Sequence, residues 1–362
     1  MSRDLLNRRR KISESTIAES TTDDAELASG QVRVQVNRFA ITANNITYGA
    51  YGNAYKYWSF FPAPEDWGRV PVWGFATVAE SRCEGIETGE RLYGFWPMSE
   101  SFVIEPVNVK PTALTDGTEH RQPLPAIYNN YSRCAADPIY HPDFEAEQMI
   151  LYPLFATSFL LADFCQDNDW FGATSIVITS ASSKTALGTA DVLRELGRDQ
   201  VTVTGLTPAG NRDFVVELGL YDNVLTYDQV DELGADAAVL LDFSGNLSLL
   251  REIHTRLGDA LRYSCRIGST HYEEEHSGDS DEPLPGPKPE PFFAPSQIQK
   301  RFKDWGPAGY AERFGGHWQR FALASRGWMT VEESEGLEGA DRVFQEFVAG
   351  RADPKTGHII RL

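Results

Sequence analysis

Polar and apolar positions alternate along the first third of the chain. From Gln31 to Ala40, Val32, Val34 and Val36 are separated by polar residues, so these valines lie on one face of an extended strand. Residues 70–79 and 89–106 continue this pattern, with glycines, aromatics and turn residues between them. The pattern predicts a small β-barrel or β-sandwich over residues 31–110.

The segments on either side of this β-rich region carry weaker signals. Residues 1–30 are polar, with Arg8, Arg9 and Arg10 in a row, no apolar stretch after them, and acidic residues following soon. We therefore expect a mobile N-terminal arm and no secretory signal, with a transit peptide as the alternative. Residues 111–147 are polar and proline-rich, and they indicate a long connection.

From residue 149 onward the chain changes to helical periods that alternate with short apolar runs. Runs such as SIVIT at 175–179 and AAVLLD at 237–242 do not alternate, which is typical of strands buried on both faces. Helices are expected over 185–196, 211–218 and 247–257. This strand–helix repetition predicts a parallel, doubly wound sheet and an α/β fold.

The last part of the chain begins with an acidic, proline-rich insert at residues 271–295, which we expect to form a mobile flap beside the ligand cleft. Helices are expected at 296–329 and 340–349, and a final strand at 358–362. The order of elements is thus a β-rich unit, an α/β unit and a return to the β-rich unit.

Composition narrows the classes of function. The net charge of −19 argues against nucleic-acid binding. The four cysteines are scattered and form no Cys/His cluster, which disfavours a structural zinc site and suits a cytoplasmic location. No apolar run reaches the roughly 18 residues of a membrane-spanning helix, so we expect no membrane insertion.

The turn between the first buried strand and the helix after it carries the clearest candidate chemistry. It reads Ser180-Ala181-Ser182-Ser183-Lys184-Thr185. Hydroxyl groups, a lysine and a helix N-terminus together suit a phosphate group. The alternative is a capped helix start without a ligand, because serine and threonine are favoured there in any case.

Several segments, in order, resemble the medium-chain dehydrogenase/reductase superfamily. VRVQVNRFAITANNITYGAY, TGERLYGF, SIVITSASSKTALGTADVLRELG, VLLDFSGN and RVFQEFVAGRADPKTGHIIRL are similar to its opening strand and substrate loop, a "GDRV.G" turn, the phosphate turn, a "V.D..G" strand end and the closing helix and strand. The chain looks like a divergent member of the zinc-free quinone-reductase and enoyl-reductase branch. Ser180, Ser183, Lys184 and Ala186 stand where the family usually has glycine.

The resemblance implies a GroES-like β-rich domain over residues 31–148 and 311–362. It also implies a Rossmann nucleotide-binding domain over residues 149–310, with NADPH as the cofactor. The second strand ends at Thr207 without the acidic residue that binds the ribose of NAD, and Asn211 and Arg212 follow near the usual place of a basic residue. The expected nucleotide-binding residues are Thr157, Ser180, Ser182, Ser183, Lys184, Thr185, Thr207, Asn211, Arg212, Asp242, Ser244, Gly245, Gly268 and Ser269.

The resemblance also directs the choice of catalytic residues. Zinc-dependent relatives place a Cys in the substrate loop and a His-Glu pair further on, whereas this chain has Asn44, Asn45, Gly74 and Phe75 in those places. A zinc-free site is therefore expected. The candidate catalytic residues are Tyr51, as the tyrosine that faces the substrate in enoyl reductases, then Tyr48, Asn44 and Asn45. The alternative for either tyrosine is a ring packed in the β-rich unit.

Together these features predict a zinc-independent, NADPH-dependent reductase of a small hydrophobic substrate: a conjugated carbonyl, a quinone or an enoyl-type compound. The sequence is compatible with a homodimer but does not decide the oligomeric state. Two alternatives remain, a non-catalytic binding or scaffold protein that keeps the fold, and a lyase or isomerase that uses the same pocket.

Overall fold

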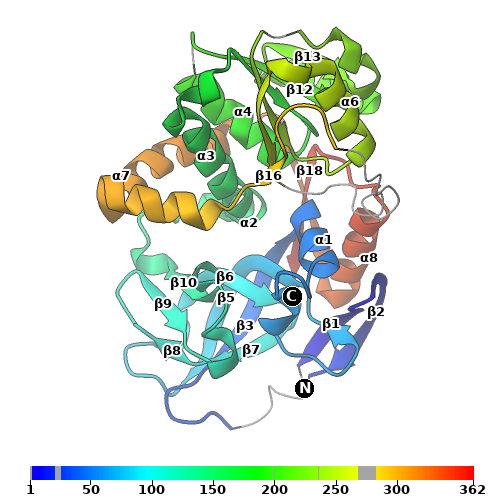
Figure 1. The fold of residues 1–362 in the computed structure, drawn as a ribbon. Coiled ribbons are helices and arrows are strands. Elements are labelled where there is room, and N and C mark those ends of the chain that lie inside the picture. The colour runs from blue at the N-terminus through cyan, green and yellow to red at the C-terminus, as the bar shows by residue number, and fades with distance from the viewer. Residues whose placement is uncertain (1, 21–25, 198, 235, 268–282) are drawn as a thin grey trace. The chain divides into compact units, whose positions relative to one another are not determined.

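The computed structural model describes residues 2–20, 26–197, 199–234, 236–267 and 283–362. The chain divides into two compact units, residues 1–150 with 329–362, and residues 151–328 (Figure 1). The first boundary lies within two residues of the expected one. The second lies at 328 and not at 310, because helix α7 (Ala294–Ser325) belongs to the second unit and packs its Phe314 and Phe321 on Phe155 of helix α3 (Tyr152–Asp167).

The first unit is built on a mixed sheet with the strand order β17-β18-β3-β5-β6-β10-β9-β8, and β7 also pairs with β3. In this order the strands are β17 (Thr330–Glu335), β18 (Thr356–Arg361), β3 (Val32–Ile41), β5 (Pro71–Ser81), β6 (Arg91–Pro97), β10 (Asn130–Arg133), β9 (Ala113–Asp116), β8 (Pro106–Val107) and β7 (Ser101–Ile104). Its helices are α1 (Ala43–Ala50), α2 (Glu145–Ile150) and α8 (Gly336–Val348), with 3-10 turns at Tyr57–Ser59, Glu119–Arg121, Ala126–Asn129, Cys134–Ala136 and Pro142–Phe144.

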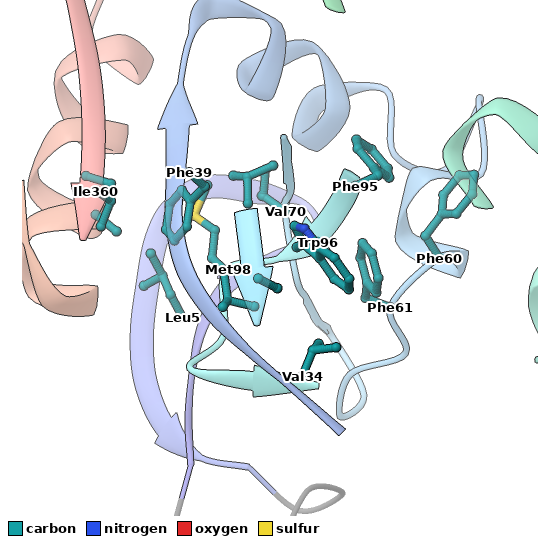
Figure 2. Close-up of a cluster of buried hydrophobic side chains, with 14 of the residues drawn as sticks. Leu5, Val34, Phe39, Phe60, Phe61, Val70, Phe95, Trp96, Met98 and Ile360 are labelled. Carbon is teal, nitrogen blue, oxygen red and sulfur yellow. The ribbon is translucent and has the colours of Figure 1, made fainter. Parts of the chain in front are cut away.

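The core of this unit follows the alternation seen in the sequence. Val32, Val34 and Val36 are fully buried on β3, which confirms the predicted inward face of that strand. Figure 2 shows Val34 and Phe39 of β3 in one cluster with Trp96 of β6 and Ile360 of β18. The last strand of the chain thus completes the core that the first part begins.

The N-terminal segment forms a hairpin, so the expectation of a mobile arm is wrong for its described part. Strands β1 (Arg3–Arg8) and β2 (Lys11–Glu19) pair antiparallel, and β1 also pairs with β4 (Trp67–Gly68). Leu5 is fully buried, and the carboxylate of Asp4 forms a buried ion pair with Arg69. A few buried apolar side chains are enough to anchor a segment, even when most of its residues are polar. The polar average composition of residues 1–30 therefore gave the wrong expectation.

Residues 111–147, expected as a long connection, are organised around one buried cation. The guanidinium of Arg121 has no exposed area and donates to Asp116 at 2.8 Å, to Tyr131 at 2.9 Å and to Asn129 at 3.0 Å. A buried charge is tolerated only when it is paired and its donors are satisfied, as they are here. Strands β9 and β10 and the turn that carries Tyr128 are thereby held together.

The second unit contains a parallel sheet with the order β13-β12-β11-β14-β15-β16. Its strands are β11 (Ser175–Ile178), β12 (Thr202–Thr207), β13 (Asn223–Thr226), β14 (Ala238–Asp242), β15 (Leu261–Arg266) and β16 (Glu290–Pro291). Besides α3 and α7, its helices are α4 (Lys184–Leu196), α5 (Arg212–Leu218) and α6 (Leu247–Leu257), with 3-10 turns at Asp169–Gly172, Ala209–Asn211, Tyr227–Glu232 and Gly258–Ala260. Numbered along the chain, the order is 3-2-1-4-5-6, that of a Rossmann nucleotide-binding fold, which confirms the predicted fold class.

The acidic insert is only partly described. Residues 271–282, on which the expected flap mostly depends, lie outside the described residues. In the part from 283 onward, Glu290–Pro291 pairs parallel with β15 and extends the sheet, so this portion is not wholly irregular. Within the described chain no single helix has the length and apolar character to cross a membrane, and Pro142–Ile150 with Tyr152–Asp167 meets that test only as a bent pair.

The hairpin gives a direct test of the N-terminal structure. Leu5→Ala should lower the free energy of unfolding by about 2–5 kcal/mol, because it removes a fully buried side chain and leaves a cavity. Thr16→Ala, at an exposed position of the same hairpin, should change it by about 0.5 kcal/mol or less. Chemical denaturation measures both, and equal small effects would mean that the segment is not anchored.

Candidate nucleotide site and aromatic cluster

The carboxyl ends of the parallel strands meet at one edge of the sheet, and the turn from β11 into α4 lies at that edge. Ser183 is the N-cap of α4, and its hydroxyl accepts a hydrogen bond from the backbone N–H of Ala186 at 3.4 Å. The first turn of α4 brings backbone N–H groups and the positive end of the helix dipole to this place. Such a helix start suits an anionic group.

Ser180 keeps the backbone conformation of the glycine that it replaces. Its φ is +48°, in the left-handed region. The turn is closed by a hydrogen bond from the N–H of Ser183 to the carbonyl of Ser180, at 2.8 Å, and the N–H of Ala181 donates to Leu206 on β12. The tight turn between β11 and α4 is therefore formed without glycine, at the cost of strain at one residue.

Tyr227, directly after β13, reaches the same turn and was not among the expected residues. Its hydroxyl lies 3.3 Å from that of Ser180. Burial raises the pKa of Tyr227, so the phenol stays protonated and able to donate a hydrogen bond at neutral pH. The sequence signal was the position alone, because a residue that follows a parallel strand lies at the ligand edge.

Two further expected residues meet beside this turn. The side-chain amide of Asn211 donates to the hydroxyl of Ser182 at 3.0 Å. Gly205 on β12 allows the close approach of the turn, because a Cβ atom there would lie 2.8 Å from the Cβ of Ala181. The structure thus joins the phosphate turn to the residues that follow the second strand.

Thr207, at the end of β12, has a buried hydroxyl group that the described part of the fold does not satisfy. Its side chain is fully buried, and its hydroxyl has no hydrogen-bond partner among the described residues. Leaving a buried hydroxyl unsatisfied costs about 1–3 kcal/mol, and natural structures rarely do so without a reason. A ribose hydroxyl or a phosphate oxygen would satisfy it, so the residues present fit a nucleotide.

Cations near this edge include Lys184, in the first turn of α4, Arg212, at the start of α5, and Arg266, at the end of β15. The side chain of Arg212 is 46% exposed, and its guanidinium lies 3.8 Å from the carboxylate of Asp213. A pair this exposed contributes little stability, and the guanidinium is available to an incoming anion.

At the point where the strand order reverses, Asp242 of β14 is tied to β11. One oxygen of its carboxylate accepts hydrogen bonds from the hydroxyls of Thr179 at 2.6 Å and Ser244 at 2.8 Å, and from the backbone N–H of Ser244. The other oxygen has no partner among the described residues. Gly245 follows with a φ of +67°, which a side chain would strain.

The remaining expected nucleotide residues are less informative. Thr185 is half-buried in the first turn of α4. Thr157 is half-buried on α3, a helix that precedes the first strand of the parallel sheet, so it does not follow a strand end. Gly268 and Ser269 lie outside the described residues.

In the β-rich unit the segment after β3, expected as a loop, forms helix α1. Asn45 is buried, with its carbonyl oxygen accepting from the backbone N–H of Thr42 at 2.7 Å and its amide donating to the carbonyl of Pro71 at 2.8 Å. Both of its polar atoms are engaged in the fold, so the structure supports a structural role for Asn45.

Tyr48 lies in a network of polar and aromatic side chains. Its side chain is 3% exposed, and its hydroxyl accepts from the amide of Asn44 at 2.7 Å and from the indole N–H of Trp73 at 3.3 Å. Tyr51 stands instead at the C-terminal end of α1, with its ring 5.8 Å from that of the exposed Tyr55. Tyr48 is thus packed in the core of the β-rich unit with its hydroxyl held by Asn44 and Trp73, whereas Tyr51 lies outside this network.

Two more phenols complete this group, which we call the aromatic cluster: Asn44, Tyr48, Tyr57, Trp73 and Tyr128. The ring centroid of Tyr57 lies 4.5 Å from that of Tyr48, and the hydroxyls of Tyr57 and Tyr128 are 3.2 Å apart. Burial raises the pKa of all three phenols, so they stay neutral. Trp73 and Tyr128 were not predicted, because their distance from Tyr48 in the sequence gives no sign of the contact.

The positions that correspond to zinc ligands hold none. A Cβ atom at Gly74 would lie 2.3 Å from the carbonyl oxygen of Arg38, so no side chain fits there, and Phe75 is fully buried. Among the described residues no group of three or more His, Cys, Asp or Glu side chains is placed to hold a metal ion.

Comparison with known proteins settles the family. The model of a family described as "protein of unknown function (DUF2855)" matches residues 39–353. The chain belongs to the DUF2855 family. No curated protein sequence matches this DUF2855 protein.

Solved structures show what fold the family has. CurA from Vibrio vulnificus is 13% identical, with a TM-score of 0.62 over 100% of this chain and 98% of its own, and its complex with NADPH gives 0.61 over 99% and 98% at the same identity. A mutant enoyl thioester reductase from Candida tropicalis is 12% identical, with a TM-score of 0.53 over 100% and 99%. The DUF2855 chain thus has the two-domain fold of the medium-chain enoyl and quinone reductases, as the sequence resemblance predicted.

The strained turn gives a test of its own. Ser180→Gly should be more stable than Ser180→Ala by about 1 kcal/mol, because both lose the hydroxyl and only glycine adopts a positive φ without a steric cost. Urea denaturation of the two variants measures this difference. If the alanine variant were equally stable, the turn would not be left-handed.

Proposed function

We propose that this DUF2855 protein is a zinc-independent, NADPH-dependent reductase of a small, hydrophobic conjugated carbonyl, quinone or enoyl-type compound. The observation that carries the proposal is the buried, unpartnered hydroxyl of Thr207, at the ligand edge of a sheet with Rossmann strand order. The complex of CurA with NADPH, a protein of the same fold, supports the choice of nucleotide.

The residues of the second unit divide the binding of the nucleotide between them. The helix start at Ser183 and Lys184, with the hydroxyls of Ser182 and Thr185, would hold the pyrophosphate. Thr207, Asn211 and Arg212 would hold the ribose and its 2′-phosphate. Since no acidic side chain ends β12, nothing there repels that phosphate.

When bound, the nicotinamide supplies a hydride. The chain's own contribution to the reaction is to bind the substrate and to stabilise the negative charge that develops on the substrate oxygen. The aromatic cluster offers flat apolar surfaces and neutral phenols, which suit a conjugated carbonyl compound. In this proposal Tyr48 donates a hydrogen bond to that oxygen.

A non-catalytic binding protein is the second candidate, and the residues that favour it are Ser180, Ser183 and Ala186 at the family's glycine positions. The left-handed turn at Ser180 keeps the tight approach of β11 to α4 that a pyrophosphate would need, which supports a nucleotide site. Binding and turnover experiments separate the two candidates.

NADPH should raise the melting temperature of the full chain more than NADH does, because a bound ligand stabilises the folded state in proportion to its affinity. Thr207→Val should leave the free protein as stable or more stable, since it removes an unsatisfied hydroxyl, yet weaken NADPH binding about five- to tenfold. Thr204→Val, on the same strand, is the matched control. Equal binding by the Thr207 variant would remove that residue from the site.

Turnover separates the two candidate tyrosines. With NADPH and a panel of enones, quinones and enoyl thioesters, Tyr48→Phe should lower kcat about a hundredfold or more, because it removes a preorganised donor to the developing oxyanion. Tyr51→Phe should stay within about threefold. The reverse result would restore Tyr51 to the role predicted from the sequence, and absence of turnover by the wild-type chain would favour the binding protein.

A further inference from the structure

The hydrogen bonds around Tyr48 have a direction. A phenol oxygen has two acceptor positions and one proton. The indole N–H of Trp73 is a donor only, and the amide of Asn44 donates to the same oxygen. Both acceptor positions of Tyr48 are thus occupied, and its own proton has no acceptor among the described residues. The hydroxyl proton of Tyr48 is therefore available to a hydrogen-bond acceptor on a bound ligand.

The fold fixes both donors. Asn44 lies one helical turn before Tyr48 on α1, so the two side chains share a face of the helix. Trp73 comes from β5, and its ring packs 5.1 Å from that of Phe95 on β6. Both side chains are half-buried, and they approach the phenol oxygen from two different elements, α1 and β5.

The rest of the cluster carries no charge. Burial raises the pKa of Tyr57 and of Tyr128, and the neighbours that contribute to the pKa of the three phenols are other tyrosines, Trp73 and Asn44. In the pair of Tyr57 and Tyr128 one proton lies between the two oxygens, which leaves a second phenolic proton for a ligand. A buried anion would meet no cation here, and its desolvation would go uncompensated.

We propose that Asn44 and Trp73 are positioning residues that make Tyr48 a one-way hydrogen-bond donor to the carbonyl oxygen of an uncharged ligand. This inference rests on the proposed function and narrows its substrate to neutral carbonyl compounds bound by a phenol that stays protonated. No proton is transferred from Tyr48 in this step, because burial makes its phenolate unfavourable.

The decisive variant is Asn44→Asp. A carboxylate oxygen in place of the amide nitrogen accepts the proton of Tyr48 and turns it away from the ligand, although Tyr48 itself is unchanged. An acidic residue is favoured in the first turn of a helix, so α1 should still form. The added charge beside the uncharged cluster should lower the melting temperature, so the affinities are compared at a temperature where circular dichroism shows every variant folded. Asn53→Asp, at an exposed position of the same segment, is the control for the added charge.

The probe is 4-phenyl-3-buten-2-one, compared with the hydrocarbon in which a methylene group replaces its carbonyl oxygen. Calorimetry on the full chain without nucleotide gives the ratio of the two affinities, which isolates recognition of the oxygen. Tyr48→Phe and Asn44→Asp should each lower this ratio about tenfold, and Asn53→Asp should leave it unchanged. Trp73→Phe should lower it by about threefold, since Asn44 still holds one acceptor position.

The infrared carbonyl stretch of the bound probe, labelled with ¹³C, is the second readout. It should lie at lower frequency in the wild type than in Tyr48→Phe and Asn44→Asp, because only the wild type donates to the carbonyl oxygen. An unchanged affinity ratio and frequency in Asn44→Asp would overturn the proposal. So would a loss in Asn44→Asp that Tyr48→Phe does not share.

Failure of this inference is distinguishable from failure of the proposed function. Because the probe is bound without nucleotide, loss of carbonyl recognition in the variants supports the inference even if NADPH is never oxidised. Conversely, turnover with NADPH by a chain whose carbonyl recognition ignores Asn44 would keep the reductase and reject the positioning role.

Discussion

The order of the six strands in the parallel sheet is the constraint on which the rest of this account depends. Since parallel strands all end at one edge, the order 3-2-1-4-5-6 collects the residues that follow four different strands at a single place. Thr179, Thr207, Tyr227 and Asp242 lie at or just after the ends of four different strands. Thr179 and Asp242 are 63 positions apart in the chain, and yet all four share that edge. The phosphate turn could lose its glycines because Ser180 accepts the backbone conformation that the sheet and α4 demand.

In the β-rich unit, a fully buried Arg121 plays the corresponding role. It accounts for the order of a segment that has few apolar residues, because its donors reach Asp116, Asn129, Tyr131 and the backbone carbonyl of Tyr128. The last of these contacts holds the turn that carries the Tyr128 phenol beside Tyr57. The position of the Tyr128 phenol in the aromatic cluster is therefore linked to a buried charge network.

Patterns with a period could be predicted from the sequence. The alternation of Val32, Val34 and Val36 and the unbroken apolar run of β11 led to the correct fold class. Single buried residues could not be predicted in this way. Leu5 and Arg121 each organise a segment through one buried side chain, and a single residue makes no periodic pattern in the sequence. The contact between Asn44 and Tyr48 could not be predicted for a related reason. It depends on α1 being a helix that places residues 44 and 48 on one face, whereas the sequence indicates a loop and favours Tyr51. The homodimer and the cytoplasmic location stay predictions from the sequence.

In the proposed function, the strand-end residues of the second unit bind NADPH through its phosphates. Phosphorus NMR of NADP⁺ titrated with the full chain tests it directly, because the pyrophosphate and the 2′-phosphate give separate resonances. Both resonances should shift or broaden, the pyrophosphate through the start of α4 and the 2′-phosphate through Thr207, Asn211 and Arg212. A spectrum that the protein leaves unchanged would contradict it.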